Sequence, residues 1–110
     1  MRAAVITEPG GPDVLKIIEV DDPVPGAEDV LIDVKASALN RADMIQRQGN
    51  YPAPAGSPSD IPGLEFAGVV LEAGERVVGM AKGDRVFGLL GGGGYASRTI
   101  THHRMAVRIP

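Results

Sequence analysis

The chain has 110 residues, of which 44% are hydrophobic, and it carries a formal net charge of −3 at pH 7. A length of this order predicts a single domain. The sequence holds no block of lysine and arginine residues and no long apolar run, so neither nucleic acid nor a membrane is an expected partner. It contains no cysteine, which excludes disulfides and cysteine-bound metals and fits a cytoplasmic location.

Short strands between tight turns are predicted for most of the sequence. The chain contains 15 glycines and 9 prolines, and its apolar runs are brief and rich in Val, Ile and Leu. The third predicted strand alternates apolar Val30, Ile32 and Val34 with polar Asp33 and Lys35, which indicates one buried and one solvent-facing side. The predicted strands cover residues 2–6, 15–20, 30–39, 64–74, 85–90, 95–101 and 104–109.

One short helix is predicted over residues 41–48, which contain helix formers and neither Gly nor Pro. Asn40 is a suitable N-cap, Asp43 suits the positive end of the helix, and Gly49 is a suitable stop. The four prolines of residues 51–63 predict an extended loop. Several strands, one short helix and long loops are typical of a small antiparallel β-barrel.

The glycine run in GLLGGGGYAS, residues 88–97, is a candidate phosphate cradle. A dinucleotide fingerprint needs a helix after the glycines and an acidic residue about 20 residues further on. Here the β-branched segment YASRTIT follows, and no acidic residue occurs after Asp84. A flexible turn between strands is therefore favoured over a phosphate site.

The adjacent histidines His102 and His103 are a candidate metal site. Neighbouring side chains on a strand point to opposite faces, so the two imidazoles are not expected to share one ion. With no carboxylate near them in the sequence, a solvated turn at a strand end is the favoured interpretation.

Two polar side chains leave alternatives open. Glu65 stands between apolar neighbours, so its carboxylate needs a hydrogen-bond partner. It is either a site residue or a structural carboxylate held by backbone N–H groups or by Arg41. Tyr51 begins the proline-rich loop, where its ring and hydroxyl serve either a binding site or the anchoring of the loop.

Five segments in a fixed order carry a resemblance to a known family: VKASALNRAD, YPAPAG, IPGLEFAGVV, KGDRVFGLL and GGYAS. The series resembles the N-terminal half of the medium-chain dehydrogenase/reductase superfamily. The segments EPGGPDVL and ALNRADMIQRQGNYP are similar to its zinc-independent NADPH:quinone oxidoreductase branch, the relatives of zeta-crystallin. The resemblance covers residues 1–110 and implies one mainly β domain, a GroES-like partly open β-barrel with one or two short helices. It forms the substrate side of a cleft, and the Rossmann cofactor domain of the family is expected to be absent from this chain.

The same resemblance implies a zinc-free transfer of hydride from NADPH to quinones or similar conjugated carbonyls. Zinc-dependent members carry a Cys ligand where this chain has Asn40 and a His ligand where it has Leu64, and neither replacement is a usual zinc ligand. Asn40 is implied to lie beside the nicotinamide and Tyr51 to line the quinone pocket, both as catalytic residues. Arg41 is implied to reach a cofactor phosphate or to pair with a nearby carboxylate.

Further expectations follow from the resemblance. The chain alone is expected to be inactive, because NADPH would be bound mainly by the missing domain. The face that this domain covers would be exposed, so a homodimer is expected. Two alternatives remain open: a stand-alone GroES-like barrel that serves as a binding or assembly module, since KGDRV also occurs in co-chaperonin barrels, and an enoyl-thioester reductase of the same superfamily.

Overall fold

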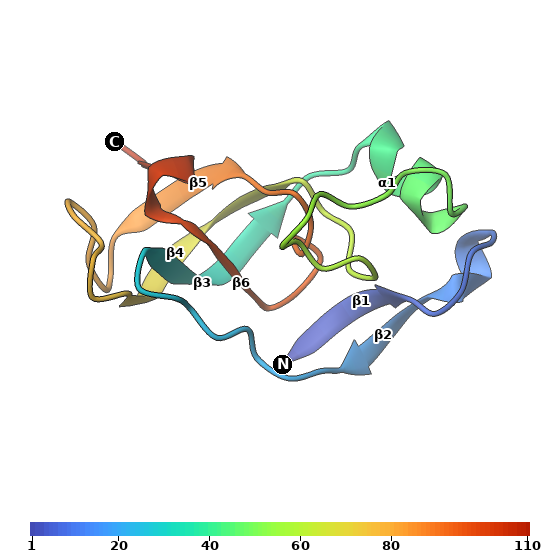
Figure 1. Cartoon of the computed structure of the whole chain (residues 1–110), viewed down its shortest axis with the longest axis horizontal. Helices are drawn as coiled ribbons and strands as arrows, with labels where there is room; N and C mark the ends of the chain where they lie inside the picture. Colours follow the sequence, from blue (N-terminus) through green and yellow to red (C-terminus); the bar gives the residue numbers. More distant parts are fainter.

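Two antiparallel sheets make up the fold in the computed structural model, which describes all 110 residues (Figure 1). One sheet has five strands in the order β6-β3-β4-β5-β7, and the other pairs β1 with β2. The five-stranded sheet curls into a half barrel, which confirms the predicted mainly β, partly open barrel. The strands are β1 (Arg2–Ile6), β2 (Leu15–Glu19), β3 (Asp29–Ser37), β4 (Glu65–Ala73), β5 (Arg85–Leu89), β6 (Arg98–His102) and β7 (Ala106–Arg108).

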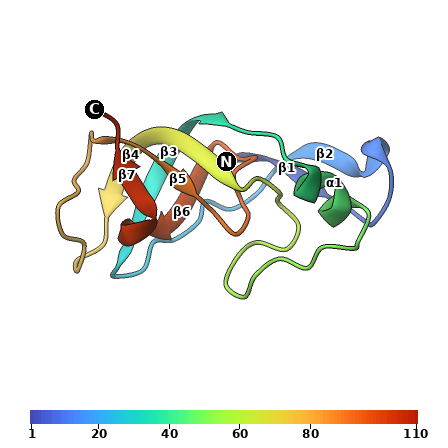
Figure 2. The ribbon, with the colours of Figure 1, turned by 90° about the horizontal axis from the view of Figure 1, so that it is seen from above.

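The helix α1 (Arg41–Arg47) lies at one end of the molecule, beside the β1–β2 pair and away from β7 (Figure 2). Asn40 is its N-cap, and Gly49 follows it with a φ of 87°, a backbone conformation that favours glycine. The predicted helix and its start are therefore confirmed, and it ends at Arg47, one residue before the predicted end, with Gln48 as its C-cap. Two short 3₁₀ turns complete the elements, η1 (Pro12–Val14) and η2 (His103–Met105). None of the helices is long and apolar enough to cross a membrane.

Two predicted strands, those expected to start at residues 95 and 104, begin three and two residues later in the structure. Residues 95–97 bond to the sheets on both sides, because Ser97 N–H donates to the Arg2 carbonyl and the Ser97 carbonyl accepts from Val34 N–H. This segment joins the β1–β2 pair to the main sheet, and β6 begins only at Arg98. The last predicted strand, 104–109, begins only at Ala106, because η2 includes its first two residues.

The main core lies on one side of the five-stranded sheet. Val30 and Ile32 of β3 are fully buried, as the alternation predicts, but Leu31 between them is also buried. A register shift between Leu31 and Ile32 in the pairing with β4 breaks the alternation. The buried residues that complete this core are Phe66, Val70, Val86 and Ala106.

The glycine run is packed closely rather than being the flexible link that the sequence predicts. Its last members, 92–94, are buried. Gly93 N–H and Gly94 N–H donate to the carbonyls of Ile61 and Gly63 at 2.8 and 3.1 Å. These donors are satisfied within the chain, so the finding supports the prediction that this segment is a turn and not a phosphate cradle.

Candidate functional site

Four side chains from distant parts of the sequence meet at the start of α1. Asn40 caps the helix, Asp43 stands at its third position, Glu65 begins β4, and Tyr95 follows the glycine run. We call these four residues the Asn40 cluster. The sequence marks Asn40 and Glu65 as candidate site residues and Asp43 as a first-turn helix residue, and it gives no role to Tyr95.

Hydrogen bonds link the whole Asn40 cluster. The amide Nδ2 of Asn40 donates to Glu65 Oε2 at 2.6 Å, and its backbone N–H donates to Asp43 Oδ2 at 2.8 Å. The Tyr95 hydroxyl donates to the same Asp43 oxygen. The partner of Glu65 is therefore the Asn40 side chain, and the predicted alternatives, Arg41 or backbone N–H groups, are wrong.

The two carboxylates of the cluster, Asp43 and Glu65, accept their side-chain hydrogen bonds from uncharged donors, the Tyr95 hydroxyl and the Asn40 amide. Asp43 is 8% exposed, and its second oxygen, Oδ1, is buried without a hydrogen-bond partner. Burial raises the pKa of Tyr95, and the hydrogen bond to Asp43 raises it further. Tyr95 therefore stays protonated at neutral pH, and its hydroxyl stabilises the Asp43 carboxylate by donating a hydrogen bond to it.

This shift predicts a specific loss of stability in alkali. The Tyr95 phenol is protonated in both states below its ordinary pKa of 10.0. Above that pH the unfolded chain releases the proton while the folded chain keeps it, so the free energy of unfolding falls as the pH rises. Urea unfolding between pH 8 and about 11 should show a steeper fall for the wild type than for Tyr95→Phe. Parallel pH profiles for the two proteins would contradict this assignment.

A cavity of about 480 Å³ opens beside the cluster. Leu39 and Met44 are 87% and 51% exposed and give it an apolar rim. Asn40, Arg41 and Asp43 supply its polar wall. A few convergent polar groups in a mostly apolar hollow are typical of small-molecule sites.

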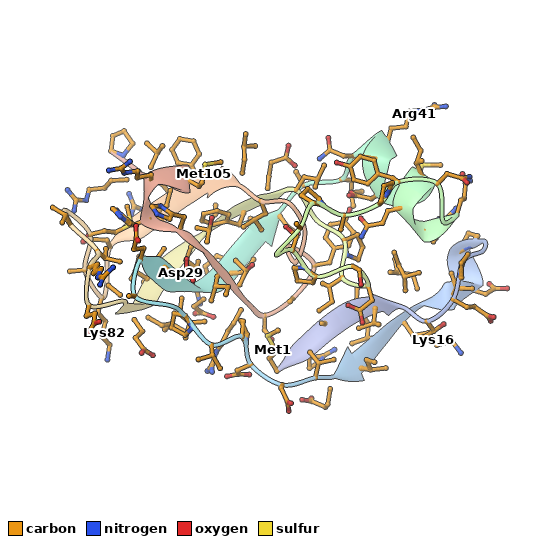
Figure 3. The ribbon with its side chains drawn as sticks, in the orientation of Figure 1. Met1, Lys16, Asp29, Arg41, Lys82 and Met105 are labelled. Atoms are coloured by element: carbon orange, nitrogen blue, oxygen red, sulfur yellow. The ribbon has the colours of Figure 1, made fainter.

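The structure places the other predicted site residues as follows. Arg41 lies on the outer side of α1, where it is exposed and makes no ion pair (Figure 3). Of the two alternatives left open for Arg41, pairing with a carboxylate is therefore wrong, and its guanidinium is free to meet an anion. Tyr51 is half-buried in the loop after α1, does not line the 480 Å³ cavity, and its hydroxyl makes no hydrogen bond.

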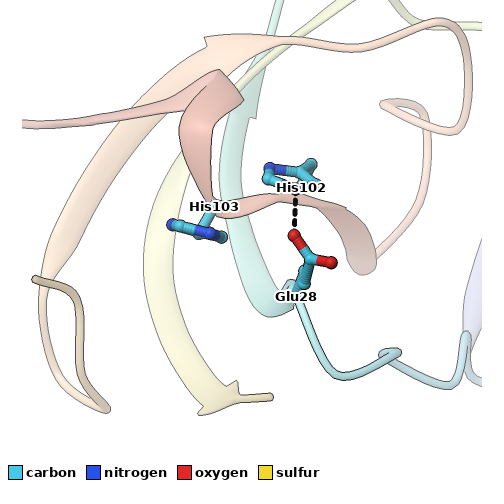
Figure 4. Close-up of side chains that lie close together, drawn as sticks. All are labelled: Glu28, His102 and His103. Carbon is cyan, nitrogen blue, oxygen red and sulfur yellow. Dashed lines mark hydrogen bonds and ion pairs between the residues drawn. The ribbon is translucent and has the colours of Figure 1, made fainter. Parts of the chain in front are cut away.

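Metal ligands do not gather in the Asn40 cluster, which offers two carboxylates and an amide but no imidazole. The one group of three potential ligands is Glu28, His102 and His103 (Figure 4). The two imidazole rings stack with centroids 4.6 Å apart, and Glu28 bonds His102 at 3.0 Å. The prediction that these histidines point apart without a carboxylate is wrong, because β6 ends at His102 and strand alternation stops there.

Tyr95 is the site residue that sequence analysis misses. Its only local signal is a tyrosine that follows a glycine run, and a tyrosine held near the core generally finds a partner for its hydroxyl. The partner, Asp43, lies 52 residues away, so nothing in the local sequence identifies it.

Comparisons with known proteins agree on one family. Residues 26–110 match the alcohol dehydrogenase GroES-like domain. The quinone oxidoreductase of Lama guanicoe is 39% identical over 112 residues, an alignment that covers 100% of this chain and 34% of that protein. Alcohol dehydrogenases are also among the relatives. The chain thus spans about a third of the length of curated relatives that it matches.

Solved structures give the same result. The human synaptic vesicle membrane protein VAT-1 homolog-like protein superposes with a TM-score of 0.91 at 34% identity, covering 100% of this chain and 35% of that one. Escherichia coli quinone oxidoreductase, solved in complex with NADPH, gives a TM-score of 0.89 at 30% identity and covers 100% and 33% of the two chains.

Proposed function

The chain belongs to the alcohol dehydrogenase GroES-like domain family, on the quinone oxidoreductase branch of an oxidoreductase superfamily. From this premise we propose that it forms the substrate-side domain of a zinc-free, NADPH-dependent quinone oxidoreductase. The observation that carries the proposal is the hydrogen bond between Asn40 and Glu65. It stands at the position where, by the family resemblance, zinc-dependent members hold a cysteine ligand.

The donor set of the Asn40 cluster does not fit a catalytic zinc ion. Such sites use three protein ligands that are mostly imidazole or thiolate. Here Asn40 Nδ2, a donor that cannot bind a cation, lies 2.6 Å from Glu65 Oε2. The reaction we propose therefore has no metal to polarise the acceptor, and side chains must supply that effect.

NADPH, when bound, supplies the hydride, and most of its contacts are proposed to come from a cofactor domain outside this chain. Within the chain we assign two residues to the cofactor. The bond to Glu65 fixes the rotamer of Asn40, which then faces the nicotinamide end at a constant position. The exposed guanidinium of Arg41 lines the same cavity and would pair with a cofactor phosphate.

Tyr51 is proposed to meet the acceptor, with Asn40 as the second catalytic residue. The hydroxyl of Tyr51 has no partner within the chain, so it is free to donate to a quinone oxygen as negative charge develops there. Its ring offers a flat apolar surface for a quinone or an enone. The exposed apolar residues Leu39 and Met44, which line the cavity, also support the proposal that the 110-residue chain forms homodimers through the face that the cofactor domain would otherwise cover.

The experiment that tests this function is to read the gene beyond the codon for Pro110 and to assay its full product. If a strand, a glycine-rich turn and a helix follow, we expect the product to oxidise NADPH with a small quinone. The 110-residue chain alone should not oxidise NADPH. The full product should not oxidise a primary alcohol with NADP⁺. A stop codon after Pro110 would refute the enzyme and favour a stand-alone binding module. Faster turnover of an enoyl thioester than of quinones would favour the thioester reductase.

A further inference from the structure

Glu28, His102 and His103 lie together where β3 begins and β6 ends, at the end of the molecule away from α1 (Figures 1 and 4). One potential ligand atom from each side chain lies within 4.8 Å of the other two. Three ligands that each lie about 2.1 Å from one ion in a tetrahedral site are themselves separated by less than this distance. The two imidazole rings are stacked, so they must turn out of the stack before a ring nitrogen of each faces the same ion, and rotation about the side-chain bonds then closes the three ligands.

The backbone holds the three residues in this arrangement. Asp29, next to Glu28, pairs with His102 in the β3–β6 ladder. His103 N–H donates to the Glu28 carbonyl at 3.0 Å, so the ladder continues past the strand end. The ligands therefore come from two adjacent and hydrogen-bonded chain segments, and little backbone order must be gained on binding.

The chemistry of the three donors selects the kind of ion. Two imidazoles and one carboxylate form a set that binds zinc with a water molecule in the fourth position, and imidazole also suits copper and nickel. Magnesium and calcium prefer all-oxygen sites. The side chains of Glu28 and His102 are 52% and 39% exposed, so an ion can reach them and keep a water ligand. We propose that Glu28, His102 and His103 form a binding site for one Zn²⁺ ion, separate from the Asn40 cluster.

The hydrogen bonds of His102 predict how the site changes on binding. Its Nδ1 accepts from Arg104 N–H at 3.1 Å, so its Nε2 carries the ring proton and donates it to Glu28. Zn²⁺ must take the place of that proton between His102 and Glu28. The proton then moves through solvent to Nδ1, which can no longer accept, and the contact with Arg104 N–H opens.

The test is a titration of the ¹⁵N-labelled 110-residue chain with zinc chloride, followed by calorimetry and by amide resonances. We expect one ion per chain and a saturable shift of the Arg104 and His103 amide resonances. Magnesium chloride should produce no shift. The variants Glu28→Gln and His103→Gln should each weaken zinc binding at least about tenfold. Glu8→Gln, which removes an exposed carboxylate outside the cluster, should leave the affinity unchanged.

Three results would overturn the proposal: absence of saturable binding, equal affinity in Glu28→Gln and in the wild type, or shifts that spread over many acidic residues without involving Arg104. If the amide resonances of a variant stay as well dispersed as those of the wild type, the variant is folded, and its weaker zinc binding reflects the lost ligand. His103→Asn serves as a second, smaller replacement if His103→Gln fails to fold.

Discussion

Gly63→Ala is expected to destabilise the chain by about 3–5 kcal/mol, a large part of the total stability of a small domain. Gly63 has a φ of 114°, and the new Cβ would lie 2.6 Å from both Gly94 Cα and Tyr95 N. No side chain can turn aside, because both atoms belong to the backbone. The two segments must separate, and the bonds from Gly94 N–H to the Gly63 carbonyl and from Tyr95 N–H to the Pro62 carbonyl would be lost. Urea unfolding followed by circular dichroism measures the change.

Gly56→Ala is the matched control for this variant. Gly56 also has a positive φ, 85°, but no atom lies within 4 Å of the place that its Cβ would occupy. It should cost only the backbone strain of a left-handed residue, about 1–2 kcal/mol. If the two variants lost equal stability, close packing against the glycine run would not explain why position 63 requires a glycine.

The same packing positions the site. Tyr95 follows directly on the glycine run, and the bond from its N–H to the Pro62 carbonyl at 2.9 Å fixes its backbone beside residues 61–63. Its hydroxyl reaches Asp43 from there. A glycine-rich segment that resembles a phosphate cradle in sequence thus acts as a close-packed support for a hydrogen-bond donor.

Local patterns predict the elements well because their causes are local. The alternation of Val30 and Ile32 reflects burial of one sheet face, and Asn40 with Gly49 marks the two ends of α1 through capping chemistry. The extra burial of Leu31 escapes this reasoning, since it depends on a register shift against a strand more than 30 residues away.

The side-chain contacts of both sites could not be predicted, because their partners are far apart in the sequence. The bond between Asn40 and Glu65 spans 25 residues, and the contact between Glu28 and His102 spans 74. Glu65 is recognisable in the sequence as a carboxylate in need of a partner, but only the fold identifies that partner. For His102, the rule that neighbours on a strand point apart fails because the strand ends at this residue.

Asn40→Asp is expected to have the second large effect. The change keeps the shape of the side chain and its ability to cap the helix. It replaces the donor that lies 2.6 Å from Glu65 Oε2 by a carboxylate oxygen, with Asp43 also close. Two carboxylates at this distance cannot both stay charged, so the folded state raises the pKa of the pair above the unfolded values near 4. The variant should therefore approach wild-type stability near pH 4 and lose about 2–3 kcal/mol by pH 7.

Asn40→Ser separates the charge effect from the function proposed for this residue. Serine also caps helices well but cannot reach Glu65 as the amide does, so stability should fall by only about 1 kcal/mol, with no added pH dependence. In the full oxidoreductase, kcat for quinone reduction should fall about tenfold or more in Asn40→Ser, and Asn50→Ala, outside the cluster, should leave it unchanged. A pH-independent loss of stability in Asn40→Asp would show that the bond to Glu65 does not matter. An unchanged kcat in Asn40→Ser would remove Asn40 from the catalytic machinery but leave its structural role intact.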